Sequence, residues 1–488
     1  MPAEALSEAP VPGNGPVWTG AFVQQALGVA ISTDAARSLV PVQDLVGLAL
    51  RRNPKRAHLL VSRVLAKHVP TRPALAIAAG RLLGVLVADA ISGQERPATR
   101  AAAVELGLLL ENDDDDGSRA RALLAALDAL ATGHPGAVTI GYAETATGLG
   151  RLVAEAIGSY YIHSTRHAPP GATASAAFEE GHSHATSHRL LPTDPAWLAK
   201  PGPVVLVDDE LSTGSTIINT IRALHALAPH GAYIVASLID LRTAADRRRF
   251  EELAAELGTA ITVVALGCGT IDLAPDILAR AQELIDGLTG PTSAPESSRE
   301  PARISAVVLD EHAVPAQRSD RFGNEPAQAL GGTPQSGAAD RIAAALEQHL
   351  PESGGTLVLG TEEFIHLPLA VAHVLDGLAG TESVRFSTTT RSPIVALDRA
   401  DYAIAAAATF ASHDVTEDGP GVRFAYNISG AGRRFSTIVV LPEPGTDPAA
   451  LEGEGSLTEA LAAHCRHVVV VHLPASLPAT AERNTPTP

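Results

Sequence analysis

Short apolar runs alternate with helical patterns along the chain between Leu39 and about Gly287. The apolar runs in this region are VTIGY from Val138, YYIH from Tyr160, PVVLVDD from Pro203, YIVASLID from Tyr233 and ITVVAL from Ile261. Strands that alternate with helices predict a parallel β-sheet with helices on both faces. Such a sheet binds its ligand at the carboxyl ends of its strands, so we expect the chemistry at that edge.

Three stretches lack this periodicity and divide the chain. Residues 1–16 and 475–488 are expected to be disordered tails. The Pro- and Ser-rich segment TGPTSAPESSREP, from Thr289 to Pro301, has the composition of a linker. The sequence therefore predicts a first α/β domain over 17–288, a linker over 289–302 and a second α/β domain over 303–474.

The composition excludes several classes of protein. The net charge is -18 and no basic stripe is present, which argues against a nucleic-acid or membrane partner. Cys268 and Cys465 are too far apart for a zinc cluster or a disulfide framework. The acids Asp113 to Asp116 suit a helix start better than a metal site. The chain starts without a signal peptide and shows no run of about 20 apolar residues, so we expect a cytoplasmic protein.

The segment VVLVDDELSTGST, from Val204 to Thr216, is an apolar strand followed by acids, a turn and a helix. The turn at Gly214 opens the helix and presents backbone amides to one point, as a phosphate requires. Hydroxyl donors would come from Ser212, Thr213, Ser215 and Thr216. Asp208 and Asp209 would accept the vicinal hydroxyls of an attached sugar and hold a metal indirectly. The alternative is a Rossmann-like turn with chance polar residues.

This order of strand, acid pair and turn resembles the signature of the type I phosphoribosyltransferases, in which it binds ribose 5-phosphate. The resemblance implies that phosphoribosyl pyrophosphate is the substrate and Mg²⁺ the cofactor. Glu210 departs from the signature, where an apolar residue is usual. It either assists the magnesium ion or points outward.

Two upstream segments are expected to bind the pyrophosphate group. The loop from Ala143 to Gly148 opens a helix and offers its amides. Glu144 in this loop would hold magnesium or orient a base, or is simply a glutamate at a helix start. Thr165 and Arg166 follow the next strand, and the Arg166 guanidinium can bridge phosphate oxygens.

The segment FEEGHSHATSHRLLP, from Phe178 to Pro192, contains His182, His184 and His188. In similar enzymes the corresponding region is a mobile hood that closes over the substrate and excludes water. His182 and His184 would serve there as proton donor or phosphate ligand. A metal-binding HxH pair and a flexible polar loop remain as alternatives.

Basic residues gather in NPKRAHLLVSRVLAKHVP, from Asn53 to Pro70. Lys55, Arg56 and Lys67 are candidate ligands for anionic phosphates. The apolar residues in the same segment have helical spacing, so a helix with a solvated basic face is the alternative.

A second, incomplete copy of the pattern starts at Thr356 with TLVLGTEEFIHLPLAVAHVL. It aligns Glu363 with Glu144, and TTRSP aligns Arg391 with Arg166. FSTIVVLPEPGTDP, from Phe435 to Pro448, stands where the phosphate loop would be, without its acid pair or turn. We therefore expect a duplicated domain that lost the ribose-phosphate cradle.

The whole chain resembles a bacterial arrangement in which a phosphoribosyltransferase-like domain precedes a TRSP domain, associated with tellurium resistance and stress. The segments that carry the resemblance are NPKRAHLLVSRVLAKHVP, GHSHATSH, DDELSTGST, GTEEF and TTRSP. It implies a phosphoribosyltransferase that acts on a base-like small molecule to make a nucleoside-like metabolite, and the fold's members are often homodimers. Glu362, Glu363, Arg391 and Ser392 would come from the second domain to a shared cleft. The alternative is a non-catalytic phosphoribosyl pyrophosphate sensor.

Overall fold

The structure is a computed structural model, and it describes residues 17–53, 55–112, 117–165, 174–179, 187–288, 302–326, 336–350, 354–378, 383–413, 421–430 and 433–476. Several predictions concern residues outside these ranges. They are the N-terminal tail, the segment Thr289–Pro301, the acids Asp113–Asp116, Arg166, His182 and His184.

The first sheet has six strands in the order β1-β10-β9-β8-β4-β5. Its strands are β1 (Val29–Thr33), β4 (Val138–Gly141), β5 (Tyr160–His163), β8 (Val204–Leu211), β9 (Ala232–Asp240) and β10 (Ala260–Leu273). All five apolar runs form parallel strands, as predicted, and the edge strand β1 is antiparallel to β10. β1 was not predicted, because its period is short and it borders the less regular N-terminal segment.

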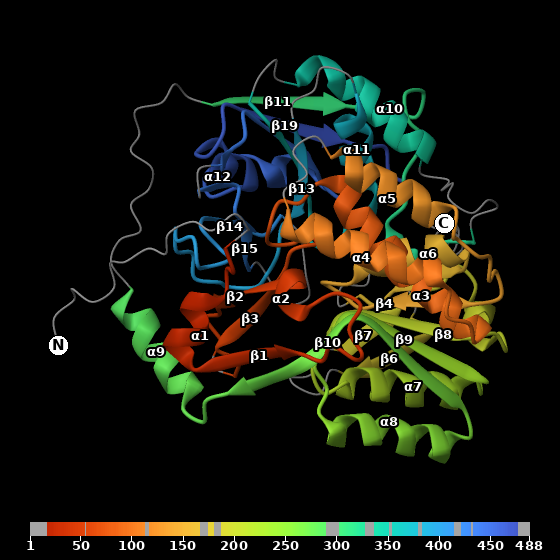
Figure 1. The fold of residues 1–488 in the computed structure, drawn as a ribbon. Coiled ribbons are helices and arrows are strands. Elements are labelled where there is room, and N and C mark those ends of the chain that lie inside the picture. The colour runs from red at the N-terminus through yellow and green to blue at the C-terminus, as the bar shows by residue number, and fades with distance from the viewer. Residues whose placement is uncertain are drawn as a thin grey trace, which may run out of the picture.

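Helices cover both faces of the first sheet (Figure 1). α7 (Ser215–Leu227) and α8 (Ala244–Leu257) lie on one face, and α3 (Pro73–Ser92) and α6 (Thr147–Ile157) lie on the other. The strands alternate between the two faces: Val204 and Leu206 join the core under α7, whereas Val205 and Val207 join the core under α3. This two-sided burial explains why the strands are continuously apolar.

A second sheet of five parallel strands has the order β11-β19-β18-β12-β13. Its strands are β11 (Arg303–Val308), β12 (Thr356–Gly360), β13 (Val384–Thr388), β18 (Thr437–Leu441) and β19 (His467–His472). Four of them, β19-β18-β12-β13, repeat the order and direction of β9-β8-β4-β5. The predicted second α/β domain is confirmed, and its topology is that of a copy of the first.

Four hairpins complete the strands: β2 (Val46–Leu50) with β3 (His58–Ser62), β6 (Ala176–Glu179) with β7 (Ser187–Leu190), β14 (Ala407–Ala411) with β15 (Val422–Tyr426), and β16 (Ser429–Gly430) with β17 (Arg433–Arg434). The helix considered for Asn53–Pro70 is wrong, because Leu59 and Leu60 lie in β3. Pairing with the fully buried strand β2 decides the conformation.

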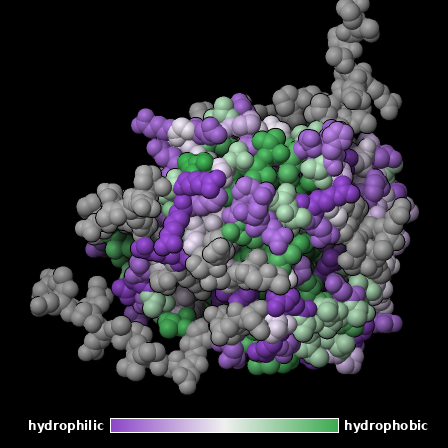
Figure 2. Space-filling model, turned by 90° about the horizontal axis from the view of Figure 1, so that it is seen from above, coloured by the Kyte–Doolittle hydropathy of each residue, from purple (hydrophilic) through white to green (hydrophobic). Residues whose placement is uncertain are grey.

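The remaining helices are α1 (Ala21–Leu27), α2 (Val42–Leu45), α4 (Pro97–Glu111), α5 (Ser118–Asp128), α9 (Ile277–Gly287), α10 (Ser336–Leu346), α11 (His366–Gly377) and α12 (Leu457–Ala462). Short 3₁₀ turns lie at Pro195–Ala199, Asp320–Phe322, Glu347–His349 and Pro448–Leu451. Seen from above, the surface exposes apolar groups among hydrophilic ones (Figure 2).

One hydrophobic core joins the two sheets. It contains residues of α3 and α6 from the first half and of α10 and α11 from the second. At this contact the Glu155 carboxylate lies between the Arg81 and Arg151 guanidinium groups and the His366 imidazole. The halves are therefore packed into one body.

Helix α3 corrects the expectation that the chain has no apolar run of about 20 residues. By length and composition it is the one helix among the described residues that could cross a membrane, with a mean hydropathy of 1.9. The sequence analysis missed this stretch. In the structure 78% of that window is buried, which identifies α3 as a core helix.

Candidate functional site

The acid pair lies at the carboxyl end of β8, as the fold requires. Asp208 and Asp209 are partly buried, and the Asp209 amide donates to Asp208 Oδ1 at 3.0 Å. Burial and the neighbouring Asp209 raise the pKa of Asp208 well above its usual value. Burial and Glu210 raise the pKa of Asp209, and Lys67 partly offsets this. Two crowded carboxylates of this kind suit hydroxyl donors or a cation.

The predicted turn follows directly. Gly214 has φ 72° and caps α7, and a Cβ at this position would lie 2.5 Å from the Phe250 ring. Thr213 Oγ1 and Ser215 Oγ lie 3.1 Å apart at the helix start. Ser212 is exposed, and Thr216 begins the helix beside Ser215. The turn thus combines hydroxyl groups with the free amides of a helix N-terminus, which is an arrangement that favours anions.

Lys67 connects the acid pair with the second predicted loop. Its side chain is buried, and Nζ lies 3.2 Å from Glu144 Oε1 and 3.1 Å from Thr145 Oγ1. The same ammonium group acts electrostatically on Asp209. Lys67 is therefore the cation between the ribose side and the Ala143–Gly148 side of the site.

Arg56 and Lys55, the other two basic candidates, lie on the β2–β3 hairpin. Arg56 Nη2 contacts both carboxylate oxygens of Glu210, at 2.6 and 2.9 Å. Glu210 is thus paired with Arg56. It does not point into solvent, and it is not an unpaired third acid beside Asp208 and Asp209. Lys55 is exposed. Burial and Arg56 lower the pKa of the adjacent His58 to about 4, so this imidazole is neutral at pH 7.

The end of β5 and the hood are joined. Ser164 Oγ accepts a hydrogen bond from the Ala143 amide at 3.0 Å and lies 2.9 Å from His188 Nδ1. Thr165 pairs with Arg189 of β7 in an isolated bridge. The described part of the predicted hood is thus the hairpin β6–β7, anchored beside the loop that begins at Ala143.

The second half reaches this site through Glu363. Its Oε2 accepts from Thr165 Oγ1 at 3.0 Å, and its backbone oxygen accepts from Thr147 Oγ1 at 3.1 Å. Arg391 Nε donates to Glu362 Oε2 at 2.7 Å, and Arg391 also interacts electrostatically with Glu144. The loop after β12 therefore contacts both the loop after β4 and the end of β5.

Ser392, the last predicted residue, faces the first half. Its Oγ lies 3.5 Å from Arg51 Nη2, and its neighbour Pro393 accepts a hydrogen bond from the Arg52 amide. The TTRSP segment is thus an interdomain contact.

Sequence reasoning missed four charged residues around these loops. Arg249 of α8 lies 3.3 Å from Ser215 Oγ. Arg321 binds Glu363 at 2.9 Å and Glu443 at 2.8 Å, and Arg423 binds Glu362. The strand registers show what Glu443 corresponds to: aligned on Gly141 and Gly360, they place it at the position of Asp209.

The acid pair Asp208 and Asp209 is the candidate position for a magnesium ion. Among the described residues, no group of three His, Cys, Asp or Glu side chains could hold a metal ion. Burial, followed by repulsion from neighbouring carboxylates, raises the pKa of both Asp208 and Asp209, and a cation beside the pair would oppose that shift. A magnesium ion carried by a phosphorylated substrate would supply that charge.

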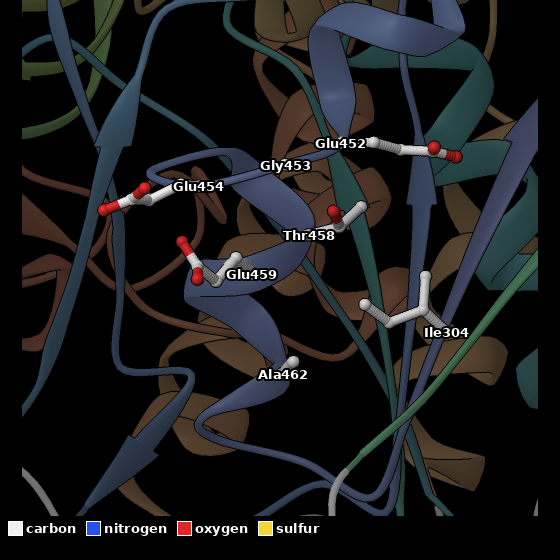
Figure 3. Close-up of a pocket in the computed structure, with 7 residues that line it drawn as sticks. All are labelled: Ile304, Glu452, Gly453, Glu454, Thr458, Glu459 and Ala462. Atoms are coloured by element: carbon white, nitrogen blue, oxygen red, sulfur yellow. The ribbon is translucent and has the colours of Figure 1, made fainter.

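A hollow of about 580 Å³ lies elsewhere, between β11 and α12 (Figure 3). Its lining comprises Ile304, Glu452, Gly453, Glu454, Thr458, Glu459 and Ala462. None of the predicted site residues borders it.

The fold and these contacts define a doubly wound α/β protein whose polar groups gather at the carboxyl edge of the first sheet. Residues 45–270 match a family described as phosphoribosyl transferase. Residues 318–461 match the family described as the TRSP domain C-terminal to it. Two family models thus match consecutive parts of the chain, first the phosphoribosyl transferase model and then the TRSP model, in the order that the sequence resemblance implied.

Similarity to solved structures is low. An adenine phosphoribosyltransferase from Trypanosoma brucei is 15% identical, with TM-score 0.19, and the match covers 26% of this chain and 55% of that one. The enzyme from Giardia lamblia is 14% identical, with TM-score 0.24 and coverage of 46% and 97%. An orotate phosphoribosyltransferase from Aeropyrum pernix is 21% identical, with TM-score 0.16 and coverage of 41% and 81%. No curated protein matches the chain.

Proposed function

We propose that the chain transfers the 5-phosphoribosyl group of phosphoribosyl pyrophosphate to a nitrogen of a base-like acceptor and releases pyrophosphate. The observation that carries the proposal is the sequence of groups along one edge: Asp208 and Asp209, then the hydroxyl-rich turn at Gly214, with Lys67 facing the acids. These groups match the diol, the 5-phosphate and the leaving group of that substrate.

The roles follow from charge. Asp208 and Asp209 accept the ribose hydroxyls, and the turn Ser212–Thr216 binds the 5-phosphate through amides and hydroxyls. Arg249 adds a cation to the phosphate side. Lys67, Thr165 and the loop Ala143–Gly148 bind the pyrophosphate, and Glu144 keeps Lys67 in place. Asp208 and Asp209 would hold a magnesium ion that arrives with the substrate, and the ion would supply positive charge against the pyrophosphate.

The chemistry needs little from the protein beyond positioning and shielding. The bond from C1 to the pyrophosphate oxygen breaks and pyrophosphate leaves with the electron pair. The acceptor nitrogen binds C1 from the opposite face, and its proton passes to the departing pyrophosphate or to solvent. The anionic surroundings of Asp208, Asp209 and Glu144 favour the positive charge that develops on the ribose ring. The hood excludes water, which would otherwise hydrolyse the substrate.

The test is pyrophosphate release from phosphoribosyl pyrophosphate and magnesium across a panel of nucleobases, with calorimetry on the same protein. The wild type should bind the substrate and release pyrophosphate with at least one base. Asp208→Asn with Asp209→Asn should lose binding. Binding without any release would favour a phosphoribosyl pyrophosphate sensor, and unchanged binding by the double variant would remove the site assignment.

A further inference from the structure

Matching hydrogen bonds relate the loops after β4 and β12. The Ala143 amide donates to Ser164 Oγ at 3.0 Å, and the Glu362 amide donates to Thr389 Oγ1 at 3.0 Å. In each half the bond joins the loop after one strand to the end of its parallel neighbour. Glu362 is therefore the structural counterpart of Ala143.

The hairpins after β5 and β13 correspond as well. Thr165 forms an isolated antiparallel bridge with Arg189 of β7, and Thr390 forms one with Phe424 of β15. Arg423 immediately precedes Phe424 and so lies on the counterpart of the hood. The second half thus keeps the whole framework that surrounds the proposed pyrophosphate position in the first.

Two arginines of that framework share one carboxylate. Arg391 Nε donates to Glu362 Oε2 at 2.7 Å, and Arg423 Nε donates to Glu362 Oε1. The Glu362 and Arg423 side chains are each 4% exposed. Arg423 Nη2 is buried and has no hydrogen-bond partner within the described part of the chain. Two guanidinium groups with a spare donor form a site for an anion with more oxygens than a carboxylate has.

Glu362 adopts an unusual backbone conformation to reach these arginines. Its φ is 46°, in the left-handed region that few residues other than glycine occupy. Ala143, at the same place in the first half, is not among the positive-φ residues and has no charged side chain. The carboxylate therefore stands in the second half at a position where the first half has only the methyl group of Ala143.

We propose that Arg391 and Arg423 form a second anion subsite, specific for phosphate-class anions, and that the Glu362 carboxylate occupies it in place of the ligand. The choice of pyrophosphate as its matching anion rests on the function proposed for the first half. The subsite is closed by the chain itself, so the wild type binds a single phosphoribosyl pyrophosphate.

Charge balance makes Glu362 the residue to change. The cations Lys67, Arg321, Arg391 and Arg423 face the carboxylates Glu144, Glu362, Glu363 and Glu443. Glu362→Ala leaves one buried positive charge uncompensated and gives the second half the side chain of its counterpart. An anion from solution then has both space and charge to bind.

The experiment is calorimetry with inorganic pyrophosphate and magnesium. The wild type and the exposed control Glu452→Ala should bind one pyrophosphate per chain, and Glu362→Ala should bind two. Adding Arg391→Ala to Glu362→Ala rebalances the charge and should return the number to one. Pyrophosphate should raise the melting temperature of Glu362→Ala more than that of the wild type, because it replaces a buried counterion.

The outcomes are separable from the test of the proposed function. If the wild type binds no pyrophosphate and Glu362→Ala binds one, the result contradicts the proposed function and supports the subsite. The subsite would be overturned if Glu362→Ala and the isosteric Glu362→Gln bound the same number of pyrophosphate molecules per chain as the wild type. The subsite would also be overturned if pyrophosphate raised the melting temperature of Glu362→Ala no more than that of the wild type, because the anion would then not replace the carboxylate.

Discussion

Thr165 Oγ1 donates a hydrogen bond to Glu363 Oε2 at 3.0 Å, so the hydroxyl at the end of β5 is held by an acid of the second half. Both residues are buried, and Arg321 Nε donates to the same carboxylate oxygen at 2.9 Å. The conformation of the proposed pyrophosphate position thus depends on the second half of the chain.

Thr165→Val should weaken both stability and substrate binding. The valine has the same shape but cannot donate to Glu363, which costs about 1 kcal/mol in the free energy of unfolding. We expect the KM for phosphoribosyl pyrophosphate to rise. Urea unfolding and steady-state kinetics measure the two effects. Thr270→Val is the matched control, because it removes an exposed hydrogen bond to Ser32 on β1 and should change neither quantity.

Lys67→Met should reduce the affinity for phosphoribosyl pyrophosphate by about 30-fold or more. Removing one partner of a buried charge pair at a binding site costs about 2 kcal/mol or more, which is about 30-fold in Kd. Calorimetry measures the affinity. The control is Lys200→Met, because the Lys200 ammonium lies over the Trp197 ring. Equal affinities for the two variants would contradict the central position of Lys67.

Gly214→Ala should destabilise the protein and abolish phosphate binding. An alanine with φ 72° costs about 1–2 kcal/mol, and its Cβ would lie 2.5 Å from the Phe250 ring. The shifted turn would no longer direct its amides to one point. Thermal melting and binding of ribose 5-phosphate report these effects. Gly231→Ala is the control, since no atom lies within 4 Å of the added Cβ and its φ is not positive.

Asp208→Asn should stabilise the protein at high pH while it abolishes substrate binding. Burial is the main cause that raises the pKa of Asp208 in the folded state above its ordinary value of 3.8. Ionised Asp208 therefore disfavours folding, and its cost appears as the pH rises above 3.8 through the raised pKa.

The expected gain of Asp208→Asn at pH 8 is on the order of 1–3 kcal/mol, the usual cost of a buried uncompensated polar group. The gain should vanish once the pH falls well below 3.8, where the wild-type carboxyl is protonated in both states. Urea unfolding of both proteins over this pH range measures the difference. A variant less stable than the wild type at pH 8 would show that Asp208 has a compensating partner.

The sequence predicted best what is local. The strand β8, the turn at Gly214 and helix α7 follow one another along the chain, so the apolar pattern and the turn residues identified them. The apolar pattern also identified the strands that repeat in the second half. The β2–β3 hairpin was misjudged, because a partner strand outside the segment decides between helix and strand for Leu59 and Leu60.

What the sequence could not predict are contacts between distant segments. Nothing near Lys67 indicates that it faces Glu144, and Arg321 lies outside every recognised motif. The acid at Glu443 was overlooked because a single glutamate after β18 resembles an ordinary turn residue until the registers of the two sheets are compared.

The two halves exchange edge contacts in a reciprocal manner: Thr71 of the first pairs with Phe386 on β13, and Asn324 of the second pairs with Tyr161 on β5. Each half thereby finishes the other's sheet edge, and one core continues between them. We expect each half, separated from the other, to expose an unpaired sheet edge and part of the shared core, and the two halves of the intact chain to unfold in one transition.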